Sequence, residues 1–354
     1  MSITQKELAQ VLGVSQVSVS RALRGSDGVG EKLRERIMDE ARKRGYSIRA
    51  SNHEARAMRK RALGKKQTTD VVCLIVPIDS ESGQDSFHAR IFSGLSDEAR
   101  KLGMETVLAG EYSAEFPLLV LRGQVDGAVC LLGDIEVSRV ERTCPVPLVS
   151  IFSDLPGADL VTVDNIEGSR QIGKYLVSQG HERAAFFGPT WELAQQRLAG
   201  LRMASGLEVP DELVFMRRFM SAGHQFEEVL QKAFGKNLVE NKEKLPFTAA
   251  VGYNDLMAAV MMHKLRAAGW DIPGELSITG FDGVWPTRAT DPQLTTCAIP
   301  LEELGAEAMR ALAQRLKNPE QGERRVVLSP EFIPGETSSP PFQTSGNLAK
   351  SQLR

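Results

Sequence analysis

The chain has 354 residues, which is enough for two or three domains of ordinary size. It is 42% hydrophobic and 25% charged, as globular proteins are, and it contains no run of about 18 apolar residues that would span a membrane. The first residues lack the pattern of a secretion signal, so we expect a cytoplasmic protein. The four cysteines and five histidines have no metal-binding spacing, and no phosphate-binding loop or nucleophile motif is present. We therefore expect no enzyme, no cofactor and no metal site.

The net charge of −2 hides an uneven distribution of charge along the chain. Residues 1–67 contain 16 Lys and Arg against 7 Asp and Glu, whereas the remainder contains 27 against 38. A basic head on an acidic body is typical of a polyanion-binding module joined to a domain with another task. A solvated basic surface would give the same balance, so the residue pattern has to decide between the two interpretations.

The basic head is predicted to contain three short helices. Thr4 begins a capping-box pattern for the first helix, and Gly13 is placed to end that helix in the left-handed conformation. Ser15 can cap a second helix over residues 16–24, and a third is expected over about residues 31–44. A helix, a glycine turn and a capped helix form the helix-turn-helix pattern.

The second predicted helix leaves polar side chains near its N-terminal end. Gln can bond an adenine edge, Arg a guanine edge, and Val can contact a thymine methyl group. A Ser at the N-terminus of a helix suits a backbone phosphate. We therefore expect DNA contacts here, and the alternative is a structural three-helix module with a polar surface. The residues concerned are Ser15, Gln16, Val17, Ser20 and Arg21.

The run TQKELAQVLGVSQVSVSRALRG resembles the N-terminus of the LacI/GalR family of bacterial repressors. In that family the second helix enters the major groove, so the resemblance implies base contacts from Gln16, Val17 and Arg21. It also implies backbone contacts from Thr4 and Ser15. Arg24 stands where the family usually has Asn, and we include it among the DNA-binding residues.

After the head the chain is rich in Arg, Lys and Ala, which by itself describes a basic linker that permits a helix. The segment resembles the family's hinge, which implies DNA contacts from Asn52 and Arg56. Met58 takes the place of the leucine that the family inserts between minor-groove bases. The usual Pro before Asn52 is absent and about three extra residues precede it, so the spacing of half-sites is open. A plain solvated linker is the alternative.

From residue 70 the pattern alternates between strands and helices. Residues 71–76 form a continuous apolar run, as a strand buried on both faces requires. Further strands are expected at 105–109, 125–132 and 148–152, and a second set begins near residue 164. Two such sets predict two lobes, each a doubly wound parallel sheet with its ligand site at the carboxyl ends of the strands.

The fold class is therefore an all-α helix-turn-helix head followed by a two-lobed α/β sensor. The resemblance to the family extends over about residues 3–335 and implies a sensor like that of periplasmic binding proteins, with three crossovers between the lobes. The predicted segments are a DNA-binding domain at 1–47, a hinge at 48–68, a sensor at 69–335 and a disordered tail at 336–354. The first lobe is placed at about 69–163 and 293–322, and the second at about 164–292 and 323–335.

By position, the resemblance implies effector contacts from Arg197, Asn254 and Asp282, with Trp191 in a contacting loop. Phe152 stands where many members have an effector-binding Asp, which points to a less polar or stacked ligand. Each residue also has a structural interpretation. Asn254 can cap the next helix, Arg197 can form a surface ion pair, Asp282 can close a turn with the following glycine, and Trp191 can be a core or rim aromatic.

We therefore predict a transcriptional regulator, most simply a repressor, that binds a pseudo-palindromic operator as a homodimer. Its effector is expected to be a sugar or a sugar derivative bound between the lobes. A nucleoside or nucleobase effector, or none, is an alternative, as is a solute-binding protein without a regulatory role. The basic head argues against a solute-binding protein. The chain has no leucine heptads, so we expect a dimer formed through the sensor and no coiled-coil tetramer.

Overall fold

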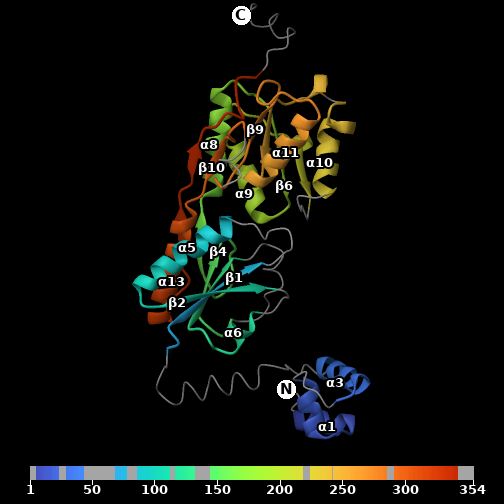
Figure 1. Ribbon diagram of the computed structural model, residues 1–354, viewed down its shortest axis with the longest axis vertical. Coiled ribbons are helices and arrows are strands. Elements are labelled where there is room, and N and C mark those ends of the chain that lie inside the picture. The colour runs from blue at the N-terminus through green and yellow to red at the C-terminus, as the bar shows by residue number, and fades with distance from the viewer. Residues whose placement is uncertain are drawn as a thin grey trace, which may run out of the picture. The chain divides into compact units, whose positions relative to one another are not determined.

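The structure is a computed structural model that describes residues 5–23, 29–43, 68–77, 86–111, 116–131, 144–217, 224–240, 242–284 and 291–341 (Figure 1). The chain divides into two compact units, Met1–Thr68 and Thr69–Arg354, and the division falls at the end of the predicted hinge. Of the hinge, only Thr68 lies within the described residues. No helix in these ranges is long and apolar enough to cross a membrane.

The first unit contains three helices, α1 (Gln5–Leu12), α2 (Gln16–Leu23) and α3 (Glu31–Lys43). Gly13 ends α1 with a φ of 68°, and the amide of Val14 donates to the carbonyl of Ala9, which closes the last turn. The hydroxyl of Ser15 accepts from the amide of Ser18 at 3.0 Å and so caps α2 as predicted. The small core of this unit contains the buried residues Leu8, Ala9, Val19, Ala22, Ile37 and Ala41.

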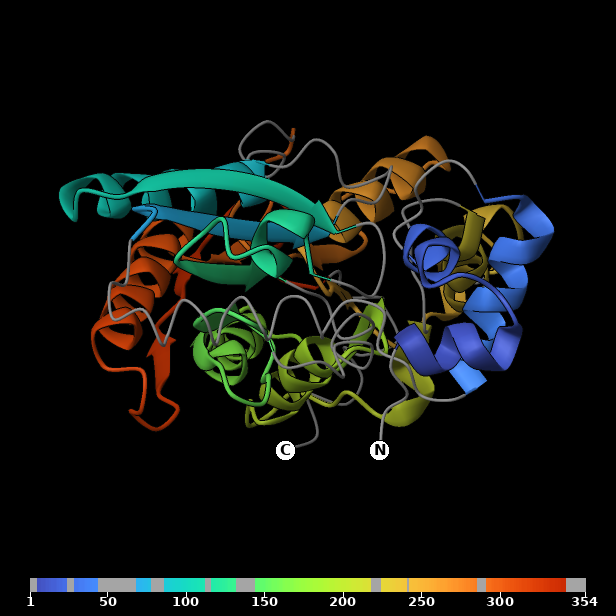
Figure 2. The ribbon, with the colours of Figure 1, turned by 90° about the horizontal axis from the view of Figure 1, so that it is seen from below.

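The first lobe of the second unit is a parallel six-stranded sheet in the order β11-β5-β4-β3-β1-β2. Alternate residues of β1 face α5 and α13 on one side and α6 on the other, so both faces are covered and the inner strands are apolar throughout. Strand β2 lies at the edge beside β1 (Figure 2). The elements are β1 (Val71–Pro77), α5 (Ser86–Lys101), β2 (Glu105–Glu111), α6 (Leu118–Leu121), β3 (Gly127–Leu131), β4 (Leu148–Ile151), β5 (Asp159–Val163), α13 (Leu301–Lys317) and β11 (Arg325–Leu328).

The second lobe is a parallel four-stranded sheet in the order β7-β6-β8-β9. Phe186 of β6 faces the cluster shared with α8 and α9, while Phe187 faces the cluster formed with α10 and α11. The elements are α8 (Asn165–Ser178), β6 (Ala184–Pro189), α9 (Glu192–Arg202), β7 (Val214–Arg217), α10 (His224–Phe234), β8 (Ala249–Gly252), α11 (Asp255–Ala267) and β9 (Ser277–Thr279), with short 3-10 turns at Asp211–Leu213, Lys236–Leu238 and Lys242–Lys244.

The chain passes between the lobes three times, but two of the crossings come later than the sequence predicted. Residues 325–328 form β11, which pairs with β5 in the first lobe, so the predicted assignment of 323–335 to the second lobe is wrong at its start. Similarly, Thr295 bridges to Thr279 of β9, so the segment from 293 begins in the second lobe. The antiparallel strands β10 (Thr296–Ala298) and β12 (Glu331–Ile333) carry these crossings.

The predicted disordered tail also begins too early. Residues 335–341, which we call the C-terminal strap, lie against β9. The hydroxyl of Thr337 accepts from the amide of Thr295 at 2.9 Å and donates to the carbonyl of Ile278 at 2.6 Å. The Nε2 of His181 donates to the carbonyl of Ser339 at 3.0 Å. The Ser, Thr and Pro composition suggested disorder, but here the hydroxyl groups satisfy backbone groups at the edge of a sheet. Residues 342–354 lie outside the described residues.

Candidate DNA-contact surface and effector site

The side chains predicted to read DNA lie on the outer surface of α2. Gln16 and Arg21 are exposed, Val17 is 59% exposed, and Ser20 is half-buried. An exposed Val beside Gln and Arg has no structural role in the core of this small unit, which leaves it available for a groove contact. The remaining predicted DNA-binding residues lie outside the described residues: Thr4, Arg24, Asn52, Arg56 and Met58.

Three predicted effector residues lie just beyond strands of the second lobe. Trp191 follows β6, Asn254 follows β8, and Asp282 follows β9. Because the carboxyl ends of parallel strands meet at one edge of a sheet, these residues lie on the same edge, where open α/β sheets bind ligands. The structure therefore brings them to one region, as the sequence predicted.

Arg197 of α9 is the centre of this region and is only 4% exposed. Its Nε donates to Oδ1 of Asn165 at 2.9 Å, its Nη1 donates to the carbonyl of Tyr253 at 2.7 Å, and its Nη2 forms an ion pair with Asp282 at 3.0 Å. The guanidinium also lies over the ring of Phe281, with 3.9 Å between its central carbon and the ring centroid. A surface ion pair is therefore the wrong interpretation of Arg197.

Asp282 both supports the local backbone and contacts Arg197. Its φ of 117° is unusual for a residue with a side chain, and its amide donates to the carbonyl of Cys297 at 2.8 Å. At the next position a Cβ on Gly283 would overlap Ala298. A residue with a side chain would therefore not fit at position 283. The tight turn directs the Asp282 carboxylate towards Arg197.

Asn254 caps α11, because its Oδ1 accepts from the amide of Met257 at 2.9 Å. The structural interpretation therefore holds for its oxygen, and the described contacts leave its amide nitrogen unused. The neighbouring Asp255 is fully buried and accepts from the amide of Val284 at 2.9 Å and from the hydroxyl of Thr296 at 2.5 Å. Asp255 thus connects the start of α11 to β10, which carries one of the crossings between the lobes. The sequence did not reveal this role.

Aromatic side chains also follow strand ends in both lobes. In the first lobe Phe152 follows β4 and stacks on Phe87 of α5, with ring centroids 6.0 Å apart. In the second lobe Trp191 meets Tyr253 edge to face at 6.0 Å. Phe87, Phe152 and Trp191 are half-buried against the apolar cluster that contains Tyr253. Phe87, Asn165 and Tyr253 were missed from the sequence, since their role depends on neighbours distant in the chain.

The chain thus combines a helical head with two parallel-sheet lobes, which is the architecture of LacI-like transcription regulators. The sequence profile of the periplasmic binding protein-like domain matches residues 174–338. The chain is 29% identical to the transcriptional repressor CytR of Escherichia coli (strain K12), over 93% of this chain and 94% of CytR.

Solved structures give the same result. The chain resembles the transcriptional regulator CelR in its cellobiose complex, with a TM-score of 0.65, 25% identity, and coverage of 95% of this chain and 100% of that one. It also resembles a LacI family regulator from Mycobacterium smegmatis, with a TM-score of 0.65, 26% identity, and coverage of 77% and 100%. The chain is thus similar over most of its length to LacI-family transcriptional regulators. These relatives are regulators and not enzymes, in agreement with the prediction from the sequence.

Proposed function

We propose that the protein is a repressor that binds a pseudo-palindromic operator as a homodimer and is controlled by a small molecule bound between its lobes. One observation carries the proposal. The same chain joins a helix with exposed Gln16, Val17 and Arg21 to a sensor that gathers a buried Arg197–Asp282 pair at its strand ends. The CelR–cellobiose complex supports a sugar or sugar derivative as the effector class.

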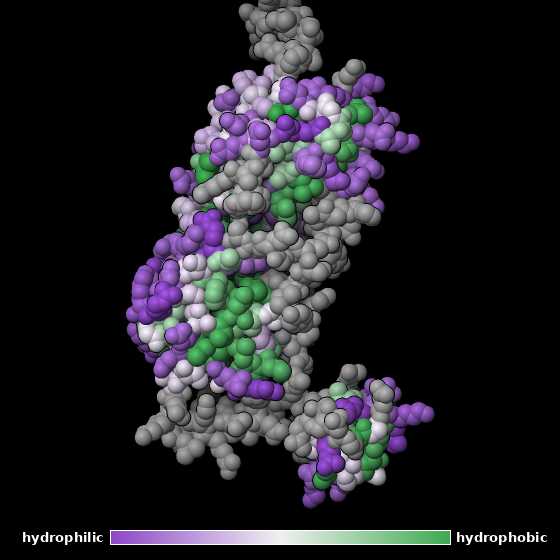
Figure 3. All heavy atoms as spheres, in the orientation of Figure 1, coloured by the Kyte–Doolittle hydropathy of each residue, from purple (hydrophilic) through white to green (hydrophobic). Residues whose placement is uncertain are grey.

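The surface of the first lobe supports the dimer. Leu102 is 42% exposed, Val107 36% and Leu108 55%, at or beside the edge strand β2. Figure 3 shows hydrophobic side chains gathered on the face that carries β2 and α6. An apolar surface next to an unpaired strand edge is costly in water, and a second copy of the chain would cover it. We expect Leu108→Lys to shift the protein from dimer to monomer in sedimentation experiments.

Control by the effector would act through the three crossings between the lobes. A ligand that holds both sets of strand ends favours one relative orientation of the lobes, which changes the spacing of the two heads in the dimer. Linkage requires operator DNA to change effector affinity by the same factor by which the effector changes DNA affinity. A ligand that binds equally well with and without operator would contradict this mechanism.

DNA recognition is tested with operators selected from a random pool by the full-length protein. Arg21→Ala should weaken binding by about 1–3 kcal/mol and relax the preference at one base pair of each half-site. Arg36→Ala, which removes the same charge from an exposed position of α3, is the matched control and should leave every base preference intact. Selection of no common sequence would refute the proposed function.

A further inference from the structure

The C-terminal strap binds the chain where it crosses between the lobes. The second crossing passes through β10 to α13, and the third passes from β11 through β12, after which the strap begins. The amides of Glu336 and Thr337 in the strap both donate to the carbonyl of Gln293, at 2.6 and 3.2 Å. The strap therefore continues the third crossing and is bonded to the second.

These contacts are concentrated on Thr295, which is completely buried at the start of the second crossing. Its amide donates to the hydroxyl of Thr337 at 2.9 Å, and its own hydroxyl accepts from the amide of Gly335 at 3.1 Å. The same hydroxyl shares a hydrogen bond of 2.7 Å with the hydroxyl of Ser338. Moving Thr295 away from the second lobe would therefore break three contacts with the strap.

The strap is also bound to the body of the second lobe. The amide of Ile278 in β9 donates to the carbonyl of Thr337 at 2.8 Å, and the amide of Ser339 donates to the hydroxyl of Ser277 at 3.1 Å. The Nε2 of His181 donates to the carbonyl of Ser339 at 3.0 Å. The strap, the start of the second crossing and the second lobe thus form one hydrogen-bonded unit.

This arrangement leaves short connections between the lobes. Strand β10 ends at Ala298 and α13 begins at Leu301, so residues 299–300 join the lobes at the second crossing. Strand β11 ends at Leu328 and β12 begins at Glu331, so residues 329–330 join them at the third. Each connection ends in a proline, which has no amide for a ladder hydrogen bond. With the strap released, the movable part of the second crossing would extend back to residue 293.

We propose that the C-terminal strap fixes the joint between the lobes and thereby maintains the lobe arrangement that binds the operator. The bound strap confines movement to residues 299–300 and 329–330. Its release lets the lobes take more arrangements, of which only some place the two heads at the spacing of the operator, so operator affinity falls. This inference rests on the proposed function and adds to it a controlling element outside the effector site.

Two variants of the full-length protein loosen the strap in different ways. Thr337→Val keeps the shape of the side chain but leaves the Thr295 amide and the Ile278 carbonyl without their partner. Gly335→Ala adds a Cβ that would overlap the backbone of residues 293–294. By hydrogen-exchange mass spectrometry, we expect amides of residues 278–280 and 295–298 to exchange at least about tenfold faster in both variants. Exchange in β1 and α13 should not change, and operator affinity should fall at least about fivefold.

Thr279→Val is the matched control. Thr279 is the neighbour of Ile278 in β9, and its buried hydroxyl has no hydrogen-bond partner among the described residues. Its exchange and its operator affinity should therefore equal those of the wild type.

Faster exchange in both lobes of the strap variants would show a general loss of stability and would overturn the inference. Unchanged affinity of these variants for a selected operator would also overturn it, while leaving the proposed function intact. If the wild type selected no operator, the proposed function itself would fail, and the inference with it.

Discussion

Each lobe of the sensor buries an arginine–aspartate pair, and the two pairs lie at opposite ends of their sheets. In the first lobe Arg315 of α13 binds both oxygens of Asp159, at 3.0 and 2.5 Å, where β5 begins. In the second lobe Arg197 meets Asp282 through one contact of 3.0 Å, where β9 has ended. The Asp159 carboxylate also accepts a hydrogen bond from the backbone amide of Arg324 at 2.8 Å.

We interpret the Asp159 pair as purely structural and the Asp282 pair as part of the proposed effector site. The Asp159 pair joins a helix to a strand at the amino end of the sheet, where α/β proteins do not bind ligands. The Asp282 pair lies at the carboxyl end, among aromatic rings, and uses a strained turn to hold its carboxylate. Burial of an ion pair therefore does not mark a ligand site by itself, whereas its position on the sheet does.

The largest expected effect comes from removing either arginine. Arg315→Met and Arg197→Met each leave a buried carboxylate without its cation, so each should lower the free energy of unfolding by about 3–5 kcal/mol. Adding Asp159→Asn or Asp282→Asn to the matching variant should recover part of the loss. Urea denaturation of the two single and the two double variants measures these free energies of unfolding. Unchanged stability of either arginine variant would show that the buried pair to which that arginine belongs does not stabilise the fold.

The second prediction concerns the close helix crossing in each lobe. A Cβ on Gly94 of α5 would overlap the backbone of Glu302 of α13, and a Cβ on Gly200 of α9 would overlap the backbone of Ile166 of α8. Gly94→Ala and Gly200→Ala should each cost about 1–3 kcal/mol, because the helices must separate. Gly322→Ala, with no atom within 4 Å of the new methyl group, is the control and should be neutral. Equal stability of all three variants in thermal unfolding would contradict this packing.

The third prediction concerns the C-terminal strap of the second lobe. Burial lowers the pKa of His181, and its hydrogen bond to the Ser339 carbonyl opposes that shift only in part. The folded protein therefore binds the proton less readily than the unfolded chain, whose histidine pKa is about 6.5. The contribution of neutral His181 to the free energy of unfolding should be complete above about pH 6.5. Below that pH the free energy of unfolding should fall, by at most about 1.4 kcal/mol per pH unit.

Urea midpoints at several pH values between 5 and 8 measure this effect. His181→Gln should flatten the pH dependence, whereas the same change at His263, an exposed residue of α11, should leave it unchanged. A wild-type profile that is already flat over this range would show that the strap does not depend on a neutral histidine.

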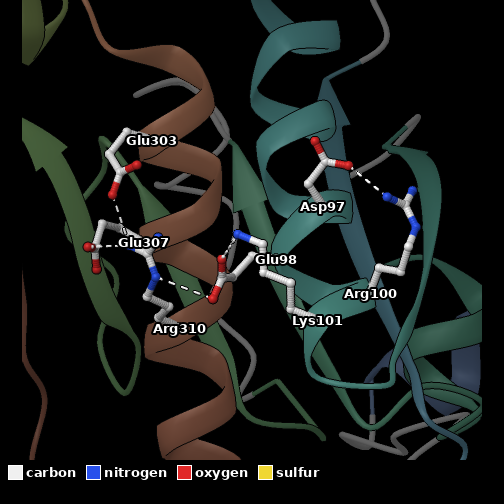
Figure 4. Close-up of polar contacts among 7 residues, drawn as sticks. All are labelled: Asp97, Glu98, Arg100, Lys101, Glu303, Glu307 and Arg310. Atoms are coloured by element: carbon white, nitrogen blue, oxygen red, sulfur yellow. Dashed lines mark hydrogen bonds and ion pairs between the residues drawn. The ribbon is translucent and has the colours of Figure 1, made fainter.

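The smallest effect is expected on the outer face of the first lobe. Arg310 of α13 contacts Glu303 and Glu307 of its own helix and Glu98 of α5, whereas among the described residues Arg100 contacts Asp97 alone (Figure 4). Arg310→Ala should cost less than about 1 kcal/mol and the cost should shrink in high salt. Arg100→Ala should have no measurable effect. A larger loss from Arg100→Ala than from Arg310→Ala in thermal unfolding would contradict the observed network.

The helices of the head were predictable because their signals are local. Gly13 supplies the left-handed residue that ends α1, and the Ser15 hydroxyl reaches an amide three residues away. The inner strands were equally predictable, because a strand covered on both faces requires a continuous apolar run such as residues 71–76. Asn254 carries a helix-capping signal of the same short range, and the structure uses it.

The sequence by itself thus determined the elements, their alternation and the edge of the second sheet at which the site residues gather. Only the tertiary structure decided that Arg197 meets Asp282, that β11 pairs with β5, and that Thr337 of the strap binds across to Ile278. These partners are 59 to 165 residues apart in the chain. Propensities and caps act over a few residues, whereas such contacts depend on how whole sheets and helices pack, which no local pattern encodes.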